Sequence, residues 1–130
     1  MNPETEREKL GFMPARVLLV EDNVIIALNA EELLREIGVE EVIVANSVAE
    51  AQFCCDKYHF DFALLDLNLG NETSIGIASR LQGEKVPFAF ASGYDDYGLL
   101  PADLGHYPIL KKPYMFSDLE RTVRSVRARD

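Results

Sequence analysis

Short apolar runs recur along the chain, separated by longer segments whose apolar residues follow helical spacing. The clearest run, residues 62–65, is apolar at every position and is followed at once by Asp66. Consecutive apolar residues are typical of a strand covered on both faces, as in a parallel sheet between two layers of helices. The pattern predicts five strands, at Arg16–Val20 and at residues 42–45, 62–65, 88–91 and 107–110.

The first helix is expected directly after the first strand. Asn23 is its predicted N-cap, and the helix runs to Ile37, with Gly38 as the C-terminal stop. Helical spacing places the apolar side of this helix at Ile26, Ala30, Leu33 and Ile37.

The remaining helices carry weaker or more local signals. Capping boxes at residues 47–50 and 117–120 are expected to open the second helix and the last one. A weaker helix is predicted at residues 73–82. The segment 94–105 has the least regular pattern, because Pro101 interrupts any helix there.

Strands that alternate with helices predict one α/β domain, a doubly wound five-stranded parallel sheet with five helices. Residues 1–14 are polar, contain two prolines and lack periodicity, so we expect a flexible lead-in before a domain at residues 15–130. The apolar stretches are far shorter than a membrane span, and the polar start does not resemble a signal peptide. We therefore expect a cytoplasmic protein without a membrane partner.

The charge and the cysteine content argue against nucleic-acid binding, a disulfide framework and a zinc site. The formal net charge of −9 argues against nucleic-acid binding, because contacts with phosphates need clustered Lys or Arg. Cys54 and Cys55 are adjacent and match neither a disulfide framework nor a zinc spacing. We interpret both as packing residues.

Polar residues follow four of the predicted strands: Glu21 and Asp22 the first, Asp66 the third, Ser92 the fourth and Lys112 the fifth. Alone, each is more often a cap, a turn residue or a solvated charge, but the carboxyl ends of parallel strands meet at one edge. Three carboxylates about 4–5 Å apart repel by several kcal/mol per pair at an effective dielectric near 20, so a hard cation such as Mg²⁺ is expected. Carboxylate, cation, lysine and hydroxyl together suit an aspartyl-phosphate.

Four segments together resemble the receiver domain of two-component response regulators. They are Val-Glu-Asp-Asn at 20–23, Leu-Leu-Asp-Leu-Asn at 64–68, Ala-Ser at 91–92 and Leu-Lys-Lys-Pro at 110–113. Each motif is weak by itself, but their order and spacing extend the resemblance over residues 15–127. The resemblance implies a flavodoxin-like (CheY-like) fold and phosphorelay signalling, with phosphate accepted from a sensor histidine kinase or a histidine phosphotransfer protein.

The same resemblance assigns the site residues. It implies that Asp66 is the phospho-acceptor and that Ser92 and Lys112 hold the phosphoryl group. The implied Mg²⁺ ligands are Glu21 through water, Asp22, Asp66 and the backbone carbonyl of Asn68. A receiver is not an enzyme beyond assisting its own phosphorylation and dephosphorylation, so a downstream protein partner is expected.

Two features depart from the common receiver pattern. Ile109 stands where most receivers carry Tyr or Phe, and Phe-Ala-Ser-Gly-Tyr at 90–94 resembles a variant subgroup marked by Phe-Ala-Thr-Gly. We therefore expect the signal to leave through residues 93–105, with Tyr94 moving in place of the missing aromatic; the alternative is that Tyr94 and Ile109 only pack. The chain ends about one helix after Lys112, which is typical of a stand-alone receiver.

Two other classes of function are open at this point. A haloacid-dehalogenase-type phosphatase also uses an aspartate at a strand end, but it requires a second acid two residues later, where this chain has Asn68. The second alternative is a phosphorylation-independent interaction module with a decayed site. The intact set of acids, hydroxyl and lysine argues against that decay.

Overall fold

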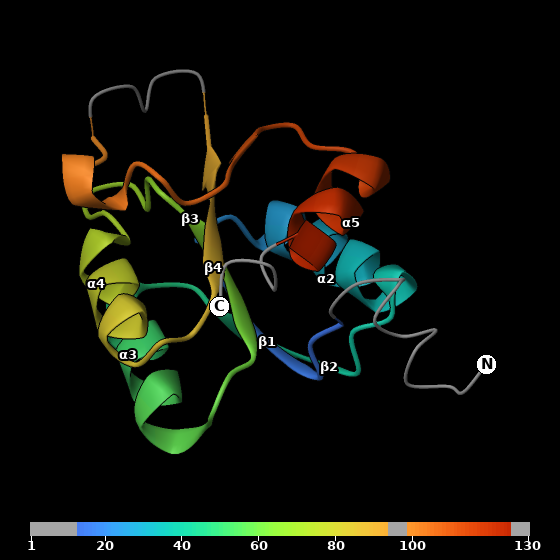
Figure 1. The fold of residues 1–130 in the computed structure, drawn as a ribbon, viewed down its shortest axis with the longest axis horizontal. Helices are drawn as coiled ribbons and strands as arrows, with labels where there is room; N and C mark the ends of the chain where they lie inside the picture. Colours follow the sequence, from blue (N-terminus) through green and yellow to red (C-terminus); the bar gives the residue numbers. More distant parts are fainter. Residues whose placement is uncertain (1–12, 94–98, 126–130) are drawn as a thin grey trace.

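The computed structural model describes residues 13–93 and 99–125 and shows one parallel sheet between two layers of helices (Figure 1). The strands lie in the order β2-β1-β3-β4-β5. Their bounds are β1 Arg16–Val20, β2 Glu41–Ala45, β3 Phe62–Asp66, β4 Phe88–Ser92 and β5 Ile109–Lys111. This order, with β3 at the centre, confirms the predicted doubly wound sheet.

Four α-helices and one 3₁₀ turn occupy the described residues. They are α2 Val24–Ile37, α3 Val48–Lys57, α4 Ile75–Gly83, α5 Phe116–Ser125 and the 3₁₀ turn Ala102–Leu104. Helices α2 and α5 cover one face of the sheet, and α3 and α4 cover the other (Figure 1). The fifth predicted helix corresponds to the 3₁₀ turn, and Tyr94, to which we gave a signalling role, lies outside the described residues.

The core consists of two apolar layers, one on each face of the sheet. All five residues of β3 are buried, including its last residue, Asp66. The run of consecutive apolar residues therefore marks a strand that helices cover on both faces, as predicted. Cys54 and Cys55 are free thiols that pack, half-buried, against the layer under α3 and α4.

The helix signals at Asn23 and Ser47 are confirmed. The Asn23 side chain accepts the Ile26 N–H at 3.0 Å, and the Ser47 hydroxyl accepts the Glu50 N–H at 3.1 Å. Gly38 ends α2 with φ +127°, a conformation that L side chains rarely adopt.

The capping box predicted at 117–120 is wrong. Helix α5 begins at Phe116, and the Asp118 carboxylate reaches back to accept the Met115 N–H at 3.1 Å. Leu119 donates its N–H to the Met115 carbonyl, so Met115 occupies the cap position. A carboxylate in the third helical position can supply half of a capping box without a Ser or Thr cap.

The starts of strand β5 and helix α4 and one position on the buried side of α2 also differ from the prediction. Strand β5 begins at Ile109, because the Tyr107 N–H donates to Leu104 and Pro108 has no N–H to donate. Helix α4 begins at Ile75, because Thr73 forms a bridge with Asn68 instead of a helical turn. The buried side of α2 is Ala27, Ala30, Leu34 and Ile37, and Leu33 is partly buried against the same core, so only Ile26, which is 37% exposed, was misassigned.

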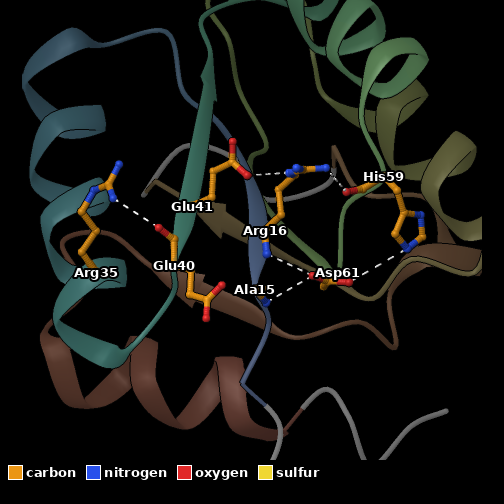
Figure 2. Close-up of polar contacts among 7 residues, drawn as sticks. All are labelled: Ala15, Arg16, Arg35, Glu40, Glu41, His59 and Asp61. Atoms are coloured by element: carbon orange, nitrogen blue, oxygen red, sulfur yellow. Dashed lines mark hydrogen bonds and ion pairs between the residues drawn. The ribbon is translucent and has the colours of Figure 1, made fainter.

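The amino-terminal ends of the strands are joined by a polar cluster (Figure 2). Asp61, directly before β3, accepts the N–H groups of Ala15 and Arg16 at 3.1 and 3.0 Å, and its own N–H donates to Arg16. Arg16 also pairs with Glu41 at 2.7 Å. These contacts fix the register in which Val20 of β1 lies beside Leu65 of β3. The residues that follow, Glu21 and Asp66, therefore reach the same edge.

Candidate functional site

Three carboxylates meet at the carboxyl ends of β1 and β3. One oxygen from each of Glu21, Asp22 and Asp66 lies within 4.8 Å of the others. Glu21 and Asp66 are only 3% and 4% exposed, whereas Asp22 is exposed. Burial of two acids side by side is costly unless a positive charge compensates them.

Lys112 supplies part of that compensation. Its Nζ atom lies 2.9 Å from Glu21 Oε1 and 2.9 Å from Asp66 Oδ2. The Lys112 N–H donates to the Ser92 carbonyl at 2.9 Å, which attaches the residue to the end of β4. The predicted convergence of strands one, three and five on one edge is thus present in the structure.

The surroundings shift the three buried groups in different directions. Burial raises the pKa of Asp66 to about 7, and the neighbouring Glu21 adds to this rise while Lys112 opposes it. Burial would also raise the pKa of Glu21, but hydrogen bonds with Lys112, with Asp66 and from the Asn23 N–H lower it overall. Burial opposes the charge of Lys112, yet its two carboxylate partners raise its pKa. The pKa of Asp66 therefore lies above that of Glu21.

The residues of this cluster fit a hard divalent cation. All the side-chain donors are carboxylate oxygens, which Mg²⁺ prefers, and the three acids with one lysine keep a formal charge of −2. The backbone also approaches closely here, since Gly70 adopts φ +88° and a Cβ on it would lie 3.7 Å from Asp22 Oδ2.

Ser92 and Asn68 follow strands that end at the same edge, but their side chains form hydrogen bonds with neighbouring backbone groups and not with the acids. Ser92 ends β4 beside Lys111 of β5, and its hydroxyl donates to the Gly93 carbonyl at 3.1 Å. Asn68 follows β3, is exposed, and accepts the Gly70 N–H through its side chain at 3.0 Å. Contact between the Ser92 hydroxyl and a phosphoryl group would require a rotation of that side chain.

A groove that the sequence did not predict lies beside the Lys112 side chain. It encloses about 560 Å³ and is lined by Ile25, Ile26, Asn29, Lys112, Pro113 and Tyr114. Burial raises the pKa of Tyr114 to about 12, and the negative charge of Glu21 contributes to the rise.

Exposed apolar side chains lie on the two segments whose residues line this groove. They are Val24, Ile25, Ile26 and Leu28 on α2, with Met115 and Phe116 on the other side; we call these six residues the apolar rim. Ile25 is 74% exposed. The signal for the rim was present in the sequence, because a run of five apolar residues at 24–28 cannot place every side chain on the buried side of one helix.

Within residues 13–93 and 99–125, no helix is long and apolar enough to cross a membrane.

Comparisons with known proteins identify chains that are similar in sequence and in fold. The transcriptional regulatory protein LytR of Staphylococcus aureus (strain N315) is 30% identical over 116 residues, which cover 87% of this chain and 47% of LytR. The chain thus spans about half the length of this curated relative. The solution structure of SdrG from Sphingomonas melonis Fr1 matches with a TM-score of 0.75 at 27% identity, covering 89% of this chain and 98% of SdrG.

A further match is the crystal structure of the response regulator TrrA from Thermotoga maritima, which is described in complex with Mg²⁺ and BeF. It has a TM-score of 0.74 at 21% identity, covering 85% of this chain and 97% of TrrA. The family model of the response regulator receiver domain matches residues 17–124, and it follows that the chain belongs to the response regulator receiver domain family.

Proposed function

We propose that this chain is a phosphorelay receiver that accepts a phosphoryl group on Asp66 from a histidine kinase or a histidine phosphotransfer protein. The observation that carries the proposal is the buried Asp66 carboxylate at the end of the central strand, 2.9 Å from Lys112 and within 4.8 Å of two more acids. Family membership supports the same reading, since receivers act in two-component signalling.

The proposed step forms a bond between an Asp66 oxygen and phosphorus while the phosphorus–nitrogen bond of the donor phosphohistidine breaks. The electron pair of that bond returns to the imidazole nitrogen. Asp66 must be ionised to attack, and the neighbouring Lys112 favours that ionised form although burial raises the pKa of Asp66. Lys112 then offers its ammonium protons to the transferred oxygens, and Ser92 can do the same once its hydroxyl leaves the Gly93 carbonyl.

Mg²⁺ is the cofactor we propose for this site, with Glu21, Asp22, Asp66 and the Asn68 carbonyl as the groups that would hold it. When bound, Mg²⁺ neutralises carboxylate and phosphoryl charge. TrrA, which shares the fold, is described in complex with Mg²⁺ and BeF, and we carry that pairing to this chain as part of the proposal.

The apolar rim supports a protein as the phosphodonor. A donor histidine must come within bonding distance of Asp66, and the rim residues Ile25 and Ile26 line the same groove as Lys112. An exposed apolar patch beside a reactive group is typical of a protein interaction site. The rim would equally serve a phosphorylation-independent interaction module, which remains the second candidate.

We also propose that the chain belongs to the Phe-Ala-Thr-Gly variant subgroup. Ile109 on β5 is 47% exposed and lacks the hydroxyl or ring of the common receiver aromatic. Its side chain can therefore not take part in a polar aromatic switch.

The test is transfer from a radiolabelled histidine phosphotransfer protein. The parent chain is expected to take up label that hydroxylamine removes, as an acyl phosphate requires, and Asp66→Asn is expected to take up none. Label that resists hydroxylamine, or equal label on the two chains, would overturn the proposal.

A further inference from the structure

The loop between β3 and α4, residues 67–74, forms a small hairpin beside the three acids. Asn68 and Thr73 form an isolated antiparallel bridge, and the Leu69 N–H donates to the Glu72 carbonyl at 2.9 Å. Leu69 is buried and anchors this side of the hairpin in the core. Gly70 is close enough to Asp22 that a Cβ on it would contact the carboxylate. The position of the hairpin therefore sets which backbone groups face the acids.

Glu72 attaches this hairpin to helix α3. Its Oε2 atom accepts the N–H of Val48 at 3.2 Å, across 24 residues of sequence. Val48 is the first residue of α3, so its N–H is one of the four that have no partner inside the helix. A carboxylate at a helix N-terminus is also favoured by the helix dipole. Because α3 packs against β1 and β2, the contact joins the loop to a rigid part of the fold.

We propose that Glu72 is a positioning residue for the cation site: its hydrogen bond to Val48 holds the hairpin so that Gly70 stays against Asp22 and the Asn68 carbonyl keeps its place two residues after Asp66. Glu72 is not itself one of the clustered acids, so it acts through the backbone of the hairpin. The inference rests on the proposed function, because it takes the Asn68 carbonyl as a ligand of Mg²⁺. It deepens that function by naming a residue outside the receiver motifs.

The test compares three variants with the parent chain by NMR titration with MgCl₂. Glu72→Ala removes the acceptor, whereas Glu72→Gln removes the charge and keeps an oxygen that can accept the Val48 N–H. Ser47→Ala is the matched control, because it removes another acceptor at the same helix terminus without touching the hairpin. We expect Glu72→Ala to weaken Mg²⁺ binding about tenfold, within the range of indirect ligand-orienting contacts, and the other two variants to stay within about twofold.

A second measurement needs no metal. Hydrogen exchange of the Leu69 amide, which donates to the Glu72 carbonyl, is expected to be about tenfold faster in Glu72→Ala and unchanged in Ser47→Ala. Thermal unfolding of the variants is recorded alongside as the measure of a merely structural role.

Four results would overturn the inference. Equal weakening by Glu72→Ala and Glu72→Gln would show that charge alone matters, and equal weakening by Ser47→Ala would show that only the stability of α3 matters. Unchanged Mg²⁺ affinity in Glu72→Ala, with Asp66 still phosphorylated, would refute the positioning role and leave the proposed function standing. A parent chain that neither binds Mg²⁺ nor accepts phosphate would refute both.

Discussion

Replacement of Asp66 by Asn should stabilise the metal-free protein, and the gain should grow with pH. Burial beside Glu21 raises the pKa of Asp66 from 3.8 to about 7, so the folded chain holds a proton that the unfolded chain has already lost above pH 4. Stability contributed by this group is present below about pH 4 and is lost as the pH rises through 7. The asparagine side chain of the variant keeps the shape of the protonated acid and cannot ionise, so the variant avoids that loss.

The size of the effect follows from the same shift. Each pKa unit corresponds to about 1.4 kcal/mol, so the free energy of unfolding of the parent should fall by roughly 2–3 kcal/mol between pH 5 and pH 8. Titration of Glu21 does not change the free energy of unfolding in this pH interval. Its pKa is lowered in the folded chain, so it affects stability only below pH 4.5, the ordinary pKa of a glutamate. The advantage of Asp66→Asn over the parent should widen by the same amount across this interval.

Urea unfolding of metal-free protein at pH 5, 6, 7 and 8, followed by far-ultraviolet circular dichroism, measures the difference. Glu32→Gln, which removes an exposed carboxylate of α2, is the matched control for the loss of one charge. Saturating MgCl₂ at pH 8 should narrow the gap, because only the parent retains the third carboxylate. A gap between Asp66→Asn and the parent that stays constant from pH 5 to pH 8 would refute the reasoning.

Three further predictions concern the site and its rim. Asp22→Asn should reduce Mg²⁺-dependent labelling by acetyl phosphate more than tenfold while the fold is kept, and normal labelling would make Asp22 only a surface acid. Lys112→Ala should lower the free energy of unfolding by about 2–4 kcal/mol at pH 8 in urea titrations, because it leaves Glu21 and Asp66 unpaired; a change below about 0.5 kcal/mol would show that the ion pairs contribute little. Ile25→Asp should leave labelling by acetyl phosphate unchanged and slow transfer from a phosphorylated histidine phosphotransfer protein about tenfold or more; equal transfer would remove the rim from donor binding.

The sheet and its acidic edge could be predicted because both depend on local sequence. A strand buried on both faces must be apolar at consecutive positions, and the residue at which the run ends must lie at the edge of the sheet. The sequence therefore predicts that Asp66, Glu21 and Lys112 lie together at one edge. The caps at Asn23 and Ser47 were predictable for the same reason, because each acts within three residues.

The errors arise where the local pattern admits more than one solution. Five consecutive apolar residues at 24–28 fit several helix rotations, and the one observed buries Ala27 and exposes Ile26. At α5 the expected box lay two positions too far along, because Met115 occupies the cap position and Asp118 supplies the carboxylate from inside the helix. The contact between Glu72 and Val48 joins two segments whose proximity depends on the packed fold, so the sequence carried no separate signal for it.

The central claim is that Asp66 is the phospho-acceptor. Intact mass spectrometry of the parent and of Asp66→Asn, each incubated with acetyl phosphate with and without MgCl₂, tests it most directly. The parent is expected to gain the mass of one phosphoryl group only with MgCl₂, and Asp66→Asn is expected to gain none. Equal labelling of the two chains, or a parent that stays unlabelled in the presence of MgCl₂, would contradict it.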